Sequence, residues 1–168
     1  MNSTELRNLQ TPLKEKYKAQ PETAIITLKA RGQIIDGVSC KVETSGGIIE
    51  AGLHPATGGS GVQACSGDML LQALVACAGV TLSAVATAIG VEIKNGIVKA
   101  EGDLDFRGTL GISKDVPVGF KTIRLQFTLQ SNATKEQIEN IAKLTERYCV
   151  VYQTLTKGVK VETQYQFS

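Results

Sequence analysis

The chain has 168 residues, which is enough for one core of ordinary size and short for two domains. Its 18 Lys and Arg against 16 Asp and Glu leave a formal net charge of +2, and the basic residues are scattered instead of clustered. A role in binding nucleic acid or an anionic membrane therefore has no electrostatic basis. The content of 42% hydrophobic and 20% charged residues is that of a globular protein, so disorder is excluded.

The N-terminal 20 residues lack the apolar segment of a secretory signal, so we expect a cytoplasmic protein with reduced thiols. Thr11-Pro12 predicts the start of a short, solvated helix, and Pro21 predicts its end. Residues 1–22 are thus predicted to be a peripheral extension, and residues 23–168 a single domain. Segments 24–30, 34–43 and 48–53 are rich in β-branched residues and are predicted to form three antiparallel strands.

A long loop and an uncharged helix follow. Residues 53–67 are rich in Gly, Ser and Pro, and a loop of this length in a compact domain is commonly functional. Residues 69–90 are apolar on every side, which is typical of a helix buried on all faces; a membrane span is the less favoured alternative because Gln72 and several hydroxyl residues dilute the apolarity. One sheet cannot enclose such a helix, so a second subunit is predicted to cover it.

The last third of the chain alternates again. Segments 97–108 and 120–131 are predicted strands, 135–148 an amphipathic helix, 149–158 a short helix and 159–167 a closing strand. The fold class predicted from this order is α+β.

Four cysteines stand in the chain: Cys40, Cys65, Cys77 and Cys149. They show no CxxC spacing and His54 is the single histidine, so neither a metal site nor any other cofactor is expected. Cys40 lies in a strand pattern and is predicted to be in the core.

Cys77 stands in the middle of the apolar helix. It is either a small hydrophobe in a packed interior or a thiol below a cleft made by the preceding loop. Cys149 opens a short helix with Arg147 nearby, a position that favours the thiolate.

The chain resembles the OsmC/Ohr family of thiol peroxidases in two motifs. The first is the acidic residue and cysteine of SGDMLLQALVAC, and the second is the cysteine of RYCVVYQTL. The resemblance covers about residues 24–167. It implies an OsmC-like fold in which antiparallel sheets wrap around long central helices in an intertwined homodimer. It also implies that Cys77 attacks an organic hydroperoxide and becomes a sulfenic acid, that Cys149 resolves it to a disulfide, and that a dithiol or lipoyl-type reductant reopens the disulfide.

The family uses an arginine and a glutamate to hold the thiolate. Arg31 is the candidate for the first role, with Arg147 as the alternative. Gly67 occupies the position of the family's acid and Asp68 the next one, and an aspartate at a helix start is commonly a cap. This departure favours a second hypothesis, a non-catalytic protein that binds a small ligand in the cavity at the dimer interface.

Further residues are candidates for the pocket. In the long loop, His54 is a turn residue or else a base or partner for the thiolate, and Cys65 is a small buried residue. Tyr148 and Tyr152 pack at the interface or line a hydroperoxide pocket.

Overall fold

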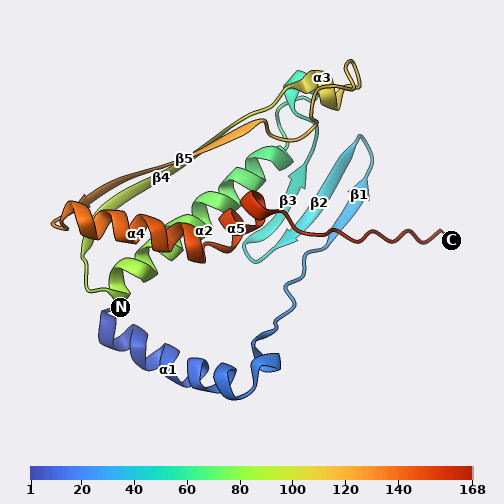
Figure 1. The fold of residues 1–168 in the computed structure, drawn as a ribbon. Coiled ribbons are helices and arrows are strands. Elements are labelled where there is room, and N and C mark those ends of the chain that lie inside the picture. Colours follow the sequence, from blue (N-terminus) through green and yellow to red (C-terminus); the bar gives the residue numbers. More distant parts are fainter. Residues whose placement is uncertain (168) are drawn as a thin grey trace.

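A computed structural model describes residues 1–167, and it confirms the α+β class: helices alternate with antiparallel strands (Figure 1). In chain order the elements are α1 (Ser3–Ala19), the 3-10 helix η1 (Pro21–Ala24), β1 (Gly32–Ile35), β2 (Ser39–Thr44), β3 (Gly47–Ala51), the 3-10 helix η2 (Pro55–Thr57), α2 (Ser66–Ala88), β4 (Ile93–Asp103), α3 (Phe106–Thr109), β5 (Thr122–Ser131), α4 (Lys135–Tyr148) and α5 (Val150–Lys157).

The strands form two separate antiparallel sheets. β1, β2 and β3 make a three-stranded sheet in sequence order, and β4 pairs with β5 in a long two-stranded ribbon. The ribbon lies along α2 (Figure 1), and α4 and α5 pack beside that helix and also against residues of β5. On β5 the predicted alternation is confirmed, because Ile123, Leu125, Phe127 and Leu129 are half-buried and the residues between them are exposed.

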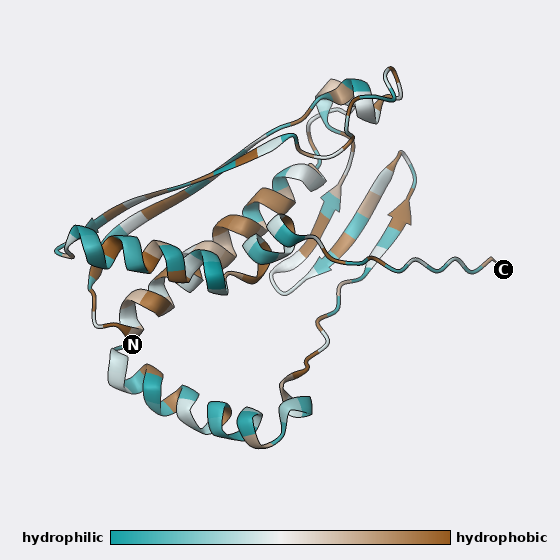
Figure 2. Ribbon diagram, in the orientation of Figure 1, coloured by the Kyte–Doolittle hydropathy of each residue, from teal (hydrophilic) through white to brown (hydrophobic). Residues whose placement is uncertain are grey.

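The core follows one face of α2. Leu74, Ala78, Leu82 and Ala86 recur every fourth residue and are buried, whereas Val80 on another face is 72% exposed. The expectation of burial on all faces is therefore not met within one chain, because apolar side chains of α2 remain exposed. Figure 2 colours much of this helix as hydrophobic. By length and composition α2 could cross a membrane, a test that core helices of soluble proteins also pass.

The N-terminal helix starts earlier than predicted. Asn2 accepts a hydrogen bond from the Glu5 amide (2.9 Å) and its own amide donates to the Glu5 carboxylate (2.8 Å), a capping box that fixes the start at Ser3. Pro12, taken as the first helical residue, lies inside the helix instead. None of the residues of α1 is buried.

The N-terminal part forms three antiparallel strands, as predicted, but two of the three predicted positions were wrong. Residues 25–30 belong to no strand of the described chain, and 34–43 form a hairpin between β1 and β2 instead of one strand. The chain reverses at Gly37 and Val38, which both have positive φ angles of 79° and 56°. The sequence Asp36-Gly37 is typical of a hairpin turn, and the prediction of one continuous strand did not take it into account.

Two later strands also differ from the prediction. β4 begins at Ile93 instead of residue 97, and past Asp103 the chain turns into α3, where Asp105 accepts a hydrogen bond from the Arg107 amide. The predicted closing strand, residues 159–167, is extended but pairs with no strand of the described chain. Its apolar side chains are exposed, among them Val161, Tyr165 and Phe167.

Candidate functional site: a pair of thiols at the start of a short helix

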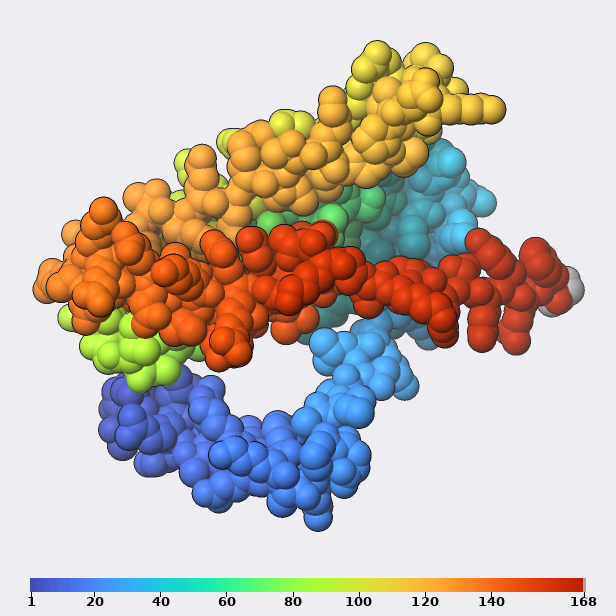
Figure 3. Space-filling view, viewed as in Figure 1, coloured from blue at the N-terminus to red at the C-terminus, as the bar shows by residue number. Residues whose placement is uncertain are grey.

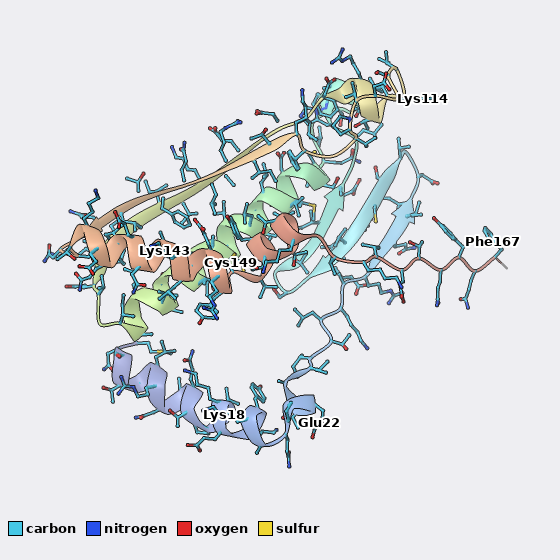
Figure 4. All side chains as sticks on the ribbon, viewed as in Figure 1. Lys18, Glu22, Lys114, Lys143, Cys149 and Phe167 are labelled. Carbon is cyan, nitrogen blue, oxygen red and sulfur yellow. The ribbon has the colours of Figure 1, made fainter. Side chains whose placement is uncertain are left out.

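Two free cysteines meet in one cluster. Cys77 lies on α2. Cys149, labelled in Figure 4, lies between α4 and α5, ending the first helix and beginning the second. Cys149 is 1% exposed and buried with Leu74 and Ala78, and Cys77 packs against the same cluster while staying partly exposed. One thiol is therefore accessible and the other is shielded.

The environment lowers the pKa of Cys77. Burial opposes ionisation of this thiol, but hydrogen bonding by the Val151 amide, the Cys149 side chain, the Val150 amide and the Thr81 side chain outweighs it. Val150 and Val151 are the first residues of α5, and the amides at a helix start have no acceptor within the helix. The start of α5 thus stabilises the Cys77 thiolate.

The pKa of Cys149 is shifted in the opposite direction. Burial raises it, and the neighbouring Cys77 raises it further, against the effect of the Tyr152 and Val151 amides. The expectation that the helix start would ionise Cys149 is therefore wrong, because burial and the neighbouring Cys77 outweigh the amides at the start of α5. The arrangement gives an ionisable thiol beside a protonated one, which is the order that attack followed by resolution requires.

The two arginine candidates contact other groups. Arg31 precedes β1, is 82% exposed at its side chain and contacts Glu43 at 3.8 Å. Arg147 places its guanidinium over the ring of Tyr148, 5.5 Å from the centroid. Neither is among the groups that shift the pKa of Cys77. Within one chain, helix amides occupy the role for which the sequence suggested an arginine.

Asp68, His54 and Cys65 come together in a second place. They line a cavity of about 220 Å³ at the start of α2, with Gln63 and Gln72 among its other walls. His54 accepts a hydrogen bond from the Ala56 amide at Nδ1 (3.0 Å), and its ring stacks on Phe106 with centroids 4.9 Å apart. Cys65 is the residue before α2 and makes no side-chain cap.

The loop that builds this cavity is ordered by backbone contacts. The Ala64 amide donates to the Glu50 carbonyl (2.9 Å) and the Gly52 amide donates to the Ala64 carbonyl (3.0 Å), which ties the loop to β3. Gly59 has to be glycine, because a Cβ there would stand 1.7 Å from the carbonyl oxygen of Leu53. Among residues 1–167, no group of three or more His, Cys, Asp or Glu side chains could hold a metal ion.

The two tyrosines border separate cavities beside the thiols. Tyr148, 57% exposed, lines a groove of about 480 Å³ together with Thr81. Tyr152 packs against the Cys149 cluster and lines a cleft of about 270 Å³ between α5 and β5. The groove shares Thr81 with the groups that lower the pKa of Cys77, and the cleft shares Leu74 with the cluster that buries Cys149.

Sequence reasoning missed Thr81 and the amides of Val150 and Val151. The helix start at residue 149 was visible in the sequence, but the thiol that faces it depends on how α5 packs against α2. Thr81 follows Cys77 by one helical turn and therefore lies on the same face of α2.

Fold and site together define a class of α+β protein with one cysteine on a long core helix and another between two shorter helices. Residues 58–164 match the family model described as OsmC-like protein. The chain belongs to the OsmC-like family, as its cysteine motifs had indicated.

Solved structures share the fold at low identity. An OsmC-like protein from Mycoplasma pneumoniae is 18% identical, with a TM-score of 0.66 over 80% of this chain and 89% of that one. An organic hydroperoxide resistance protein from Elizabethkingia anophelis is 17% identical, with a TM-score of 0.61 over 80% and 90%. An OsmC-like protein of unknown function from Vibrio cholerae is 13% identical, with a TM-score of 0.63 over 77% and 94%. No curated protein matches the chain significantly.

Proposed function

We propose that the protein is a cysteine-dependent peroxidase that reduces organic hydroperoxides in the cytoplasm. The observation that carries the proposal is the difference between the two thiols: the pKa of Cys77 is lowered, and the pKa of its shielded neighbour Cys149 is raised. The thiolate is the nucleophile in thiol chemistry, so the more accessible sulfur is also the more reactive one. The similarity of the fold to an organic hydroperoxide resistance protein supports the same assignment.

The first step is attack of the Cys77 thiolate on the terminal oxygen of the hydroperoxide. The O–O bond breaks, an S–O bond forms, and the alkoxide leaves and takes a proton to become the alcohol, while Cys77 becomes a sulfenic acid. The Val150 and Val151 amides stabilise the thiolate before attack. This step oxidises the sulfur by two electrons and reduces the peroxide by two.

The second step joins the two sulfurs. The Cys149 thiol condenses with the sulfenic acid, releasing water and forming a Cys77–Cys149 disulfide. The packing of both residues in one cluster supports this pairing. A dithiol or lipoyl-type reductant then supplies two electrons and two protons and restores both thiols by disulfide exchange.

We also propose that the working unit is an intertwined homodimer. Three features support it: α2 buries only one face, residues 25–31 carry exposed Ile25, Ile26 and Leu28, and the extended C-terminal segment has no strand partner in the described chain. Two such segments with alternating apolar residues are suited to pair with the sheets of a second copy.

Stopped-flow kinetics test the proposal. The reduced protein should consume cumene hydroperoxide in a rapid phase, and Cys77→Ser should abolish that phase. Cys65→Ser is the matched control, since Cys65 lies in the other cavity, and it should leave the rate unchanged. Equal rates for wild type and Cys77→Ser would refute the enzymatic function.

A second candidate is a non-catalytic protein that binds a small ligand. It is favoured by Gly67 at the position of the family's acid and by the pairing of Arg31 with Glu43 on the surface. Mass spectrometry after mild peroxide separates the two candidates. A peroxidase should gain a Cys77–Cys149 disulfide first, whereas a binding protein should show slow oxidation at all four cysteines.

A further inference from the structure

The helices α4 and α5 are separated by a single residue. α4 ends at Tyr148, α5 begins at Val150, and Cys149 between them has extended backbone angles (φ −73°, ψ 109°). In a continuous α-helix each amide donates to the carbonyl four residues earlier, so the Val150 amide would donate to Glu146 if α4 continued. The break at Cys149 releases this amide, and it hydrogen-bonds the Cys77 thiol instead.

The side chain of Gln153 takes the acceptor that the Val150 amide leaves. Its Nε2 donates to the Glu146 carbonyl oxygen at 2.7 Å, across the break between the two helices. The backbone amide of Gln153 donates to the Cys149 carbonyl (2.9 Å), which places Gln153 in the first turn of α5. A carbonyl in the last turn of a helix has no intrahelical partner and is therefore open to such a side-chain donor.

α5 depends on contacts with its surroundings for its orientation. It has eight residues, none of which is buried, and it lies at the surface of the molecule next to α4 (Figure 3, orange to red). An isolated helix of this length is unstable in water. Val151 and Tyr152 pack against the cluster that contains Cys149, and the bond from Gln153 adds a directional link to α4. This link fixes the start of α5, where the amides that face Cys77 lie.

We infer that Gln153 is a positioning residue: by occupying the Glu146 carbonyl it keeps α4 from continuing and leaves the Val150 amide for the sulfur of Cys77. Without a donor at residue 153, the Glu146 carbonyl is free, and the Val150 amide is in register to donate to it as in a continuous helix. One amide then has two competing acceptors. Resting on the proposed function, the bond made by Gln153 raises the rate at which Cys77 attacks the hydroperoxide.

Gln153→Met tests the inference, because methionine has nearly the same length as glutamine and no hydrogen-bond donor. The rate at which iodoacetamide alkylates Cys77 is followed against pH in the reduced, full-length protein. At a pH below the Cys77 pKa of both wild type and variant, the rate in the variant should be several-fold lower, and about tenfold lower if the Val150 amide is lost completely. Thr156→Val is the matched control: it removes the bond from the Thr156 hydroxyl to the Tyr152 carbonyl (2.8 Å) on the same helix and should leave the pH profile unchanged.

A double variant separates positioning of one amide from a general loosening of α5. Val150→Pro has no amide at residue 150, so adding Gln153→Met to it should shift the pH profile of Cys77 no further. A shift in the double variant, relative to Val150→Pro, as large as that of Gln153→Met alone would overturn the inference. Equal profiles of wild type and Gln153→Met would also overturn it.

Hydrogen exchange in the wild type tests the bond without any substitution. The side-chain amide protons of Gln153, followed by NMR, should exchange more slowly than those of Gln126, which is exposed on β5. Equal exchange at the two residues would show that the bond to Glu146 is not kept in solution and would overturn the inference.

Alkylation needs no peroxide, so the inference and the proposed function can fail separately. A shifted Cys77 profile in Gln153→Met, without rapid consumption of cumene hydroperoxide by the wild type, would confirm the role of Gln153 and refute the peroxidase. Rapid consumption by the wild type, with equal Cys77 profiles in wild type and Gln153→Met, would retain the peroxidase and overturn the inference.

Discussion

Replacing Val150 with proline removes one of the amides that stabilise the Cys77 thiolate. Val150 is the first residue of α5, a position where proline is tolerated because its amide has no partner in the helix. The preceding residue, Cys149, has φ −73° and ψ 109°, which is compatible with a following proline. The Val150 side chain is 69% exposed, so the substitution should remove the N–H with little loss of packing.

The expected effect is a rise in the pKa of Cys77 by about one unit. A hydrogen bond to a charged group contributes about 1.5–3 kcal/mol, and one pKa unit corresponds to about 1.4 kcal/mol. We take the low end because the Val151 amide, the Cys149 side chain and the Thr81 side chain remain. At a pH below the Cys77 pKa of both the wild type and the variant, the thiolate fraction of the variant should be about tenfold lower. The rate at which Cys77 reacts should fall by the same factor. Above both pKa values the difference should vanish.

The assay is the rate of alkylation by iodoacetamide across pH, resolved by peptide mass spectrometry. Cys40 and Cys65 serve as internal references in the same sample. Val150→Ala is the matched control, because it also removes the Val150 side chain but keeps the backbone amide N–H. Identical pH profiles of Cys77 in Val150→Pro and Val150→Ala would refute the assignment of thiolate stabilisation to the start of α5.

Three other predictions concern stability, resolution and assembly. Thr145→Val should raise the free energy of unfolding in urea by about 1 kcal/mol, because the Thr145 hydroxyl is buried without a hydrogen-bond partner; a loss of stability would show that the hydroxyl is satisfied. Cys149→Ser should leave a Cys77 sulfenic acid that dimedone traps after one equivalent of hydroperoxide, and equal trapping in wild type would count against resolution by Cys149. A chain that ends at Gly158 should dissociate to monomers at higher concentration than the full chain in light scattering, and unchanged assembly would remove the C-terminal segment from the interface.

Strong local patterns predicted much of the fold. The alternation of Ile123, Leu125, Phe127 and Leu129 located β5, and Thr134 with Gln137 formed a capping box at the start of α4. The predicted order of helices and strands is recovered up to residue 158. These features depend on neighbours in sequence, which is why periodicity and capping residues identify them.

The errors arose where local patterns compete or where partners are distant. Asp36-Gly37 forms a hairpin turn within a run of β-branched residues that had predicted one strand. The capping box of Asn2 and Glu5 starts α1 well before Pro12. Residues 25–30 and 159–167 have strand-like sequences but no strand partner within the described part of the chain, and a pairing between chains leaves no trace in a local pattern.

The candidate site was predictable in part. The cysteine motifs identified Cys77 and Cys149, and the structure places both in one cluster. The source of the thiolate's stabilisation was not predictable, since backbone amides carry no signature in the residue types. Their direction depends on the packing of α5 against α2.

The central claim is that Cys77 is the thiol that attacks the hydroperoxide and that Cys149 is its resolving partner. Peptide mapping of the protein after one equivalent of an organic hydroperoxide tests it most directly. The account predicts the loss of two hydrogens and a single disulfide joining Cys77 to Cys149, with Cys40 and Cys65 still alkylatable. A disulfide through either of those two cysteines, or four thiols that remain reduced, would contradict it.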